Sequence, residues 1–246
     1  MAEDVKRKIA DIVGENYVFG AVLYYFGIEF YNYSQKTLFQ ACEERGLDAG
    51  KVMHQLESVG NASLQEKVSL QNYPIELIIE YLKHTHHIFV KERLPYLATL
   101  IENFPSNEGV GEDLKMVFPL FVEDFIHHIY QEEDTLFTYV KALQNFLQGK
   151  GNVSQVYYLM EKHSLQRYAM EHSEHDDEMK GIRQLTGDYY IPEGATLHLK
   201  VIMSELKLLE EQLITHAGIE NDILFPKALM MEHRARKDFS EKIGLN

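Results

Sequence analysis

The chain has 246 residues, of which 45% are hydrophobic, and its formal net charge is −14. This length and apolar content are sufficient for a full hydrophobic core, and the acidic balance argues against nucleic acid as a partner, because phosphate backbones are bound by clustered lysine and arginine. The single cysteine, Cys42, excludes an internal disulfide and a cysteine-ligated zinc or iron–sulfur centre, and it favours the reducing cytoplasm.

The amino-terminal stretch predicts neither a membrane span nor a secretion signal. The longest apolar run, residues 18–28, is too short to cross a bilayer. The basic residues 6–8 precede an acidic, amphipathic stretch instead of the apolar stretch of a signal peptide. We therefore expect no membrane partner.

Residues 1–60 are expected to form a separate small helical domain. Three or four short helices are predicted there, and a polar connection, residues 61–74, follows them. The helices are separated by Gly14, Gly27, Gly46 and Gly60.

The rest of the chain predicts four long helices. Helix-forming residues predominate, and apolar residues recur at steps of three and four. Prolines and glycine-rich stretches separate four segments, 74–103, 111–148, 152–186 and 194–237, whose ends are placed to within about ±2–4 residues. Because helices with short connections pack side by side, we predict an all-α fold in which residues 75–246 form an antiparallel four-helix bundle.

One pattern of ligand-type residues occurs twice, as H-x3-E-x-D-x-L-F beginning at His128 and again at His216. The glutamates of the two copies are Glu132 and Glu220, and the copies are separated by 88 positions. On a helix, residues four apart lie on one face, about 6 Å apart along the axis. The pattern therefore predicts two half-sites related by duplication.

The same offset of 88 positions links the other histidine-rich regions, because it relates His87 to His175 and His84 to His172. With His87 and His175, each of the four predicted helices carries one candidate ligand at a similar depth of the bundle, where inward-facing side chains commonly hold metal ions. His84 and His172 each precede a candidate by three residues and are further candidates, as ligands or as neighbours of the site.

This set of histidines and glutamates suits iron or manganese. If Glu132 and Glu220 each bridge two ions, every ion receives two nitrogens and two oxygens, and an oxo or hydroxo bridge leaves one position open for oxygen, peroxide or nitric oxide. Structural zinc prefers four closed ligands, and calcium prefers oxygen alone. Ferritin-like bundles carry Glu-x-x-His instead, so the pattern is typical of the hemerythrin-like arrangement of a dinuclear site.

A structural interpretation stands beside this one, because a histidine and a glutamate four residues apart also stabilise a helix without metal. The repeated Leu-Phe pairs are expected in the core beneath the site. Asp134 and Asp222 are either exposed helix charges or groups that orient a ligand. His86, His127 and His163 are expected at the surface.

On these residues, the chain resembles the iron–sulfur cluster repair di-iron proteins, the repair-of-iron-centres family with a hemerythrin-like domain, over nearly its whole length. The matching motifs are a histidine seven residues before Leu94-Pro95, H-x3-E-E-x-x-L-F at 128–137, S-E-H-D at 173–176 and H-x3-E-N-x-x-L-F-P at 216–226. The resemblance implies four terminal histidine ligands and two bridging glutamates, namely His87, His128, His175, His216, Glu132 and Glu220. It does not support His84 or His172 as ligands.

The first 60 residues resemble the small amino-terminal domain of that family but lack its cysteine pair. Where the family carries Cys-Cys-Gly-Gly, residues 31–34 read Tyr-Asn-Tyr-Ser, and Cys42 does not replace the pair by position. We expect no thiol chemistry from this domain, which would then serve in packing or in a homodimer.

The resemblance implies a protein that repairs damaged iron–sulfur clusters, or supplies iron to them, under nitrosative or oxidative stress, with iron–sulfur proteins as iron acceptors. The alternative is a hemerythrin-like protein that binds or senses oxygen or nitric oxide without donating iron, which the missing cysteine pair favours. Enzymatic turnover, such as reduction of nitric oxide or peroxide, would need an electron donor that the sequence does not identify.

Overall fold

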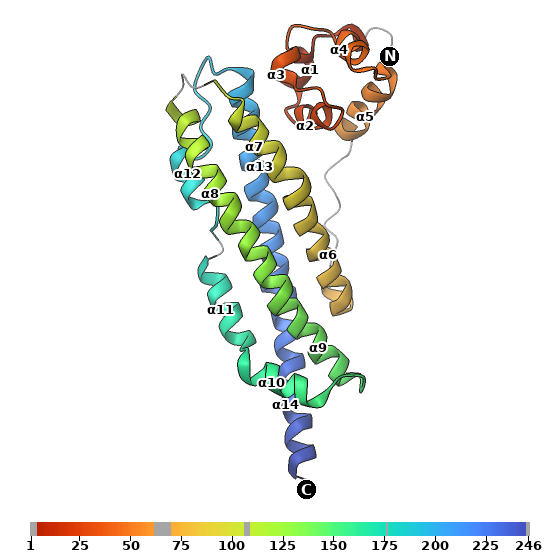
Figure 1. Ribbon diagram of the computed structural model, residues 1–246, viewed down its shortest axis with the longest axis vertical. Helices are drawn as coiled ribbons and strands as arrows, with labels where there is room; N and C mark the ends of the chain where they lie inside the picture. The colour runs from red at the N-terminus through yellow and green to blue at the C-terminus, as the bar shows by residue number, and fades with distance from the viewer. Residues whose placement is uncertain (1–3, 62–69, 106–108, 176, 245–246) are drawn as a thin grey trace. The chain divides into compact units, whose positions relative to one another are not determined.

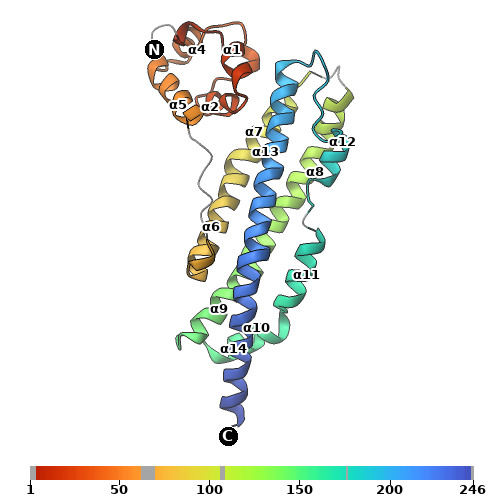
Figure 2. The ribbon, with the colours of Figure 1, turned by 180° about the vertical axis from the view of Figure 1, so that it is seen from behind.

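A computed structural model of the chain describes residues 4–61, 70–105, 109–175 and 177–244, with the backbone alone at residues 4 and 61 and over 171–175 and 242–244. Its named elements are all helices (Figures 1 and 2). In chain order they are η1 (Asp4–Lys6), α1 (Ile9–Glu15), α2 (Val18–Tyr25), α3 (Phe30–Tyr33), α4 (Leu38–Arg45), α5 (Ala49–Asn61), η2 (Leu70–Asn72), α6 (Ile75–Ile88), η3 (Phe89–Arg93), α7 (Leu94–Glu102), α8 (Gly109–Gln131), η4 (Glu132–Phe137), α9 (Thr138–Leu147), α10 (Val153–Lys162), α11 (Leu165–His175), α12 (Lys180–Leu185), α13 (Leu197–Ile219), η5 (Glu220–Leu224) and α14 (Phe225–Gly244). The segments η3, η4 and η5 are π-helices.

The predicted all-α fold is confirmed, since the described part of the chain contains no strand beyond one isolated bridge. Three of the four predicted long segments are pairs of α-helices joined directly by a π-helix: α6 to α7, α8 to α9 and α13 to α14. None of the described helices is both long enough and apolar enough to cross a membrane.

The third predicted segment, residues 152–186, is interrupted. His163 adopts extended backbone, with φ −117° and ψ 139°, and ends α10. Ser164 then begins α11 by accepting a hydrogen bond from the backbone N–H of Arg167 at 3.3 Å. Serine is a favoured residue at a helix start, so the local sequence stops and restarts the helix here.

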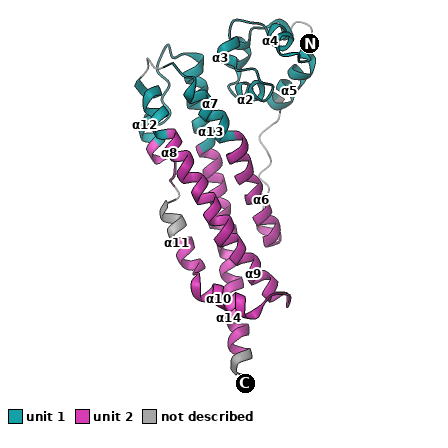
Figure 3. Ribbon diagram, viewed as in Figure 1, with its two compact units in different colours: residues 1–68, 93–117, 182–209 teal, residues 69–92, 118–181, 210–246 magenta. Residues whose placement is uncertain are grey.

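The chain divides into two compact units (Figure 3). Unit 1 comprises Met1–Val68, Arg93–Val117 and Ile182–Leu209, and unit 2 comprises Ser69–Glu92, Phe118–Gly181 and Glu210–Asn246. These compact units follow other boundaries than the predicted domains, residues 1–60 and 75–246, and do not test them. The division into those domains stays a prediction.

Helix α4 in unit 1 shows how local sequence sets the ends of the short helices. Thr37 Oγ1 accepts from the backbone N–H of Gln40, and Gln40 Oε1 accepts from the N–H of Thr37. Gly46 follows the helix with φ 67°, a conformation that costs glycine little. The helix buries Cys42, and burial with the nearby charge of Asp48 raises the pKa of its thiol.

Tyr31, at the place of the resembling family's cysteine pair, is packed within unit 1. Its ring stacks on the imidazole of His198, with centroids 4.4 Å apart and planes 3° from parallel. His198 Nε2 donates to the carbonyl of Leu100 at 2.9 Å, and Phe30 and Phe104 lie edge-on to the same imidazole. An aromatic contact therefore stands where the family has thiols.

Unit 1 also buries a carboxyl group, that of Glu205 on α13, whose Oε2 lies 3.4 Å from Nη1 of Arg93. Burial raises the pKa of Glu205 to about 7 from an ordinary value of 4.5, and the charge of Arg93 opposes this only in part. The folded protein therefore binds more protons than the unfolded chain between these two pH values.

The free energy of unfolding is expected to fall as the pH rises from about 5 to about 8, by roughly 1–3 kcal/mol through this one group. The contribution is complete below the unfolded pKa and is lost as the pH rises through the folded pKa. Glu205→Gln should remove this part of the pH dependence, because glutamine does not titrate. Urea denaturation of both metal-free proteins at pH 5 and pH 8 measures it, and equal pH slopes in the two proteins would contradict the assignment.

The core of unit 2 lies directly against the segments that carry the repeated motif. On α6, Ile75, Ile79 and Leu82 are buried at helical spacing, as expected for one inward face. Both Leu-Phe pairs of the motif belong to the same core, which confirms that they pack in the interior: Leu136, Phe137, Leu224 and Phe225. Helices α9 and α11 pack against α14, and α6 packs against η5.

Candidate metal centre

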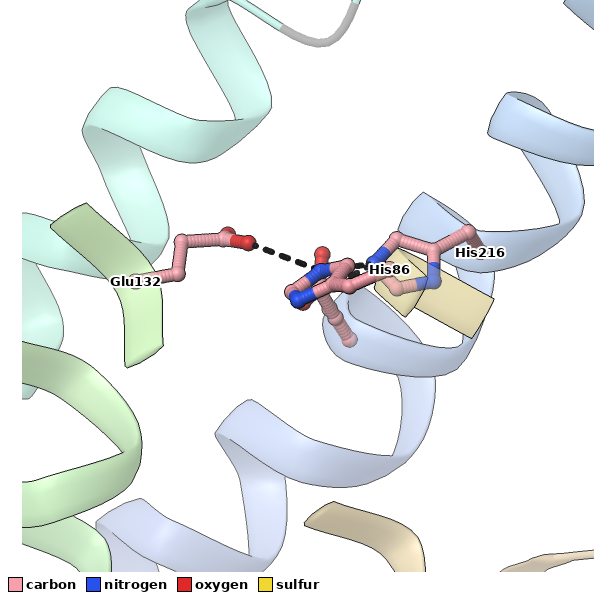
Figure 4. A group of neighbouring side chains, drawn as sticks. His86, Glu132 and His216 are labelled. Carbon is pink, nitrogen blue, oxygen red and sulfur yellow. Dashed lines mark hydrogen bonds and ion pairs between the residues drawn. The ribbon is translucent and has the colours of Figure 1, made fainter. Parts of the chain in front are cut away.

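Four ligand-type side chains converge in the interior of unit 2: His86 of α6, Glu132 of η4, His216 of α13 and Glu220 of η5. One donor atom of each lies within 4.8 Å of the others, and the four residues are between 1% and 8% exposed. Figure 4 shows His86 between Glu132 and His216. His86 Nε2 lies 3.4 Å from Glu132 Oε2, and His216 Nε2 lies 3.5 Å from Glu220 Oε1.

Each helix that supplies this group changes to π-helix at the site. Segment η4 begins at Glu132, η5 begins at Glu220, and η3 begins three residues after His86. A π-helix hydrogen-bonds to the fifth residue instead of the fourth, and short π-helices occur frequently at functional sites. The duplicated motif thus produces the same backbone feature twice, with its glutamate as the first π-helical residue.

Hydrogen bonds at Nδ1 fix the tautomer of both imidazoles. Thr85 Oγ1 donates its hydrogen to the carbonyl of Leu82 at 2.7 Å, so it accepts from His216 Nδ1, which lies 2.8 Å away. Glu133 Oε1 accepts from His86 Nδ1 at 3.0 Å. In the neutral form of each imidazole Nδ1 therefore carries the hydrogen, and Nε2 presents a lone pair.

The Nε2 atoms of His86 and His216 face each other at 2.9 Å. Two lone pairs at this distance repel unless a proton or a metal ion lies against both. Imidazole nitrogens beside carboxylate oxygens are ligands that divalent transition-metal ions accept, and hydrogen bonds at the outer nitrogen commonly orient metal-binding histidines. The residues of this group therefore fit a metal ion.

The carboxylates make the group attractive to cations. Burial alone would lower the pKa of His86, but the hydrogen bonds of Glu132 and Glu133 and the charges of Glu132 and Glu220 outweigh it and raise this pKa above its ordinary value. Burial would raise the pKa of Glu133, but its hydrogen bonds with His86 and Lys83 lower it. Glu133 therefore stays ionised as an acceptor for His86.

A cavity of about 340 Å³ adjoins the group within unit 2, and its lining includes His128 and Glu178. His128 Nε2 lies 3.4 Å from Glu132 Oε1 and 3.6 Å from Glu178 Oε1. The side chains of His128 and Glu178 are 39% and 25% exposed, so this side of the cavity is nearer to solvent. The apolar part of the lining comprises Phe125, Leu136, Leu213, Ala217 and Phe225.

The structure brings together Glu132, His216 and Glu220 of the predicted ligands, and places His128 beside Glu132. The helix-stabilising interpretation of the two His/Glu pairs does not account for the convergence of side chains from different helices. The roles of all these residues as ligands stay predictions.

The other predicted ligands lie outside the four-residue group. His84 and His87 are exposed. His172 and His175 are on α11, but their side chains lie outside the described residues. Ligation by these four histidines stays a prediction.

The expectation that His86 lies at the surface is wrong, because the residue is 2% exposed. The apolar spacing of α6 contained the signal: Ile75, Ile79 and Leu82 are followed four residues later by His86, and the next residue along the helix is turned away by about 100°. Glu133 is the second glutamate of the H-x3-E-E motif, whereas no comparable signal pointed to Thr85 or Glu178.

The remaining candidates are peripheral. His127 is exposed, as expected, whereas His163 is half-buried with its Nδ1 3.0 Å from the hydroxyl of Tyr168. Asp134 and Asp222 are exposed, which favours the interpretation of both as helix charges.

A family model described as the hemerythrin HHE cation binding domain matches residues 77–228, more than half of the chain. The iron-sulfur cluster repair protein YtfE of Cronobacter sakazakii is 26% identical over 211 residues, covering 84% of this chain and 89% of that protein. The iron-sulfur cluster repair protein ScdA of Staphylococcus epidermidis is 23% identical over 224 residues, with 89% and 96% covered. YtfE of Yersinia pseudotuberculosis is 24% identical over 203 residues, with 80% and 85% covered. These matches confirm the resemblance to the repair-of-iron-centres family, and the chain belongs to the hemerythrin HHE cation binding domain family.

Proposed function

We propose that this chain is a non-haem di-iron protein of the cytoplasm that repairs damaged iron–sulfur clusters, or supplies iron to them, under nitrosative or oxidative stress. The observation that carries the proposal is the buried group of two histidines and two glutamates whose donor atoms converge. The names of the similar proteins, iron-sulfur cluster repair proteins, support the repair function.

The residues of the site have two roles in holding iron: some would bind it, and others orient the residues that bind it. His86, His216, Glu132 and Glu220 would bind it, and Glu133 and Thr85 keep the two imidazoles in the tautomer that leaves Nε2 available. When bound, iron supplies redox chemistry and coordination positions for small ligands. The cavity beside these groups has walls that are partly apolar, with Phe125, Leu136 and Leu213 among them.

The proposed partners are iron–sulfur proteins as iron acceptors and oxygen or nitric oxide as small ligands, with no nucleic acid and no membrane. The net charge of −14 disfavours phosphate backbones and anionic lipid surfaces alike. A homodimer through the amino-terminal helices is part of the same proposal.

A second candidate function is reversible binding or sensing of oxygen or nitric oxide without iron donation. The absence of the family's cysteine pair favours it. The chain has one cysteine, Cys42, which is buried, and Tyr31 stands in an aromatic contact where the family has its thiol pair. If the protein does repair clusters, as in the first proposal, the repair proceeds without a cysteine pair of its own.

The test uses anaerobic protein loaded with ⁵⁷Fe and an iron–sulfur dehydratase inactivated by nitric oxide. Recovery of the dehydratase activity, with ⁵⁷Fe in its cluster, is the result expected for repair. Glu220→Ala serves as the matched control, because it removes one carboxylate from the buried group. A stable, reversible oxygen adduct without any loss of ⁵⁷Fe would favour the second function and reject iron donation.

A further inference from the structure

Glu178 lies beside the metal-binding group although no sequence motif includes it. It occupies the short turn before α12, lines the same cavity as the buried group, and has Oε1 3.6 Å from His128 Nε2. The same Nε2 atom lies 3.4 Å from Glu132 Oε1. An imidazole nitrogen thus lies near two carboxylate oxygens, and Glu132 belongs also to the buried group.

The charges of the cavity favour more than one cation. Three carboxylates line it, those of Glu132, Glu178 and Glu220, and no lysine or arginine is among the described residues of the lining. One divalent ion at the buried group would balance the charges of Glu132 and Glu220. A second divalent ion beside His128 would be balanced in part by Glu178 and in part by an anion from solvent, such as hydroxide.

We propose that Glu178 is a ligand of a second divalent transition-metal ion, which it holds together with His128 and Glu132. The inference rests on the proposed function, because it assigns a ligand within the same dinuclear site. Mixed nitrogen and oxygen ligands suit Fe²⁺ and Mn²⁺, whereas Ca²⁺ would prefer oxygen ligands alone.

The second position is also the exchangeable one. His128 and Glu178 have side chains 39% and 25% exposed, whereas those of His216 and Glu220 are 9% and 1% exposed. A ligand near solvent can detach and be replaced by water with little rearrangement. The ion held by Glu178 is therefore the one that an acceptor protein would receive first.

The alternative for Glu178 is a structural ion pair or hydrogen bond with His128, and Glu178→Gln separates the two roles. Glutamine still accepts a hydrogen bond from an imidazole N–H, but it is a weak, neutral metal ligand. A structural role therefore predicts unchanged metal binding, and a ligand role predicts a weaker second ion.

The experiment is a titration of the full-length, metal-free chain with Mn²⁺, in which electron paramagnetic resonance measures the free aquo ion. Wild type is expected to bind two ions, and Glu178→Gln should weaken the second at least about 10-fold while the first stays within about twofold. Asp177→Asn, a change at the exposed neighbouring carboxylate, should bind both ions as wild type does. Circular dichroism checks that each variant is folded.

Two results would overturn the inference, and they are distinguishable. If wild type and Glu178→Gln both bound two ions with equal affinities, Glu178 would not be a ligand, and the dinuclear site of the proposed function would stand. If wild type bound a single ion, both the second position and the dinuclear site would be rejected.

Discussion

Glu132→Ala and His216→Ala are each expected to weaken metal binding by more than about 100-fold, so that the purified variants contain little iron. Each change removes a donor atom from the buried group, and Glu132 also lies beside His128. The loss should exceed the 10- to 100-fold effect that is typical of residues that only orient a ligand. Elemental analysis and an iron-edge absorption spectrum of wild type and variants measure it.

Asp134→Ala is the matched control, because Asp134 is exposed on the same π-helix as Glu132. Circular dichroism of the metal-free variants checks that each is folded, because removing one member of a buried polar group leaves its partners unpaired. Full metal content in Glu132→Ala or His216→Ala would show that the buried group is not the metal centre.

His86→Ala is expected to weaken metal binding at least about 10-fold more than His87→Ala. His86 is buried with its Nε2 2.9 Å from that of His216, whereas the adjacent His87 is exposed. Adjacent residues of an α-helix point about 100° apart, so both imidazoles cannot face the same ion. Metal titrations of the two variants, each the control for the other, measure the difference.

The opposite order of metal affinities would indicate a different rotation of α6. If His87→Ala lost metal and His86→Ala kept it, α6 would be turned by one residue in the metal-bound protein. The spacing of His87 to Leu94-Pro95, on which the family resemblance relies, would then describe the loaded state.

The long helices and the repeated motif were predictable from the sequence because both depend on regular periodicity. Apolar spacing located the segments that became α6 to α7, α8 to α9 and α13 to α14, and the repeat located Glu132 and Glu220. The break at His163 was not predicted, because it depends on a single serine that caps the next helix.

The spacing of the motif could not predict whether His86 or His87 faces inward, and the reason is physical. The π-helix η3 lies between these histidines and Leu94, and it changes the number of residues per turn. A fixed distance along the sequence therefore does not fix which histidine faces inward. Glu178 was missed because it lies in a turn, where helical periodicity gives no information on direction.

Each π-helix accommodates one extra residue without turning the helices on either side of it. A π-helical turn holds about one residue more than an α-helical turn, so deleting one residue from η4 would restore a regular α-helix. The deletion would leave α8, with His128, and α9 in nearly the same rotation relative to one another, because the π-helical turn and the α-helical turn that replaces it each carry the chain once around the helix axis. The extra residue therefore alters the local backbone, which begins at Glu132, and not the core faces of the flanking helices. One inserted residue in each copy of the motif is thus sufficient to change the backbone at the candidate metal-binding glutamate while both flanking helices keep their packing.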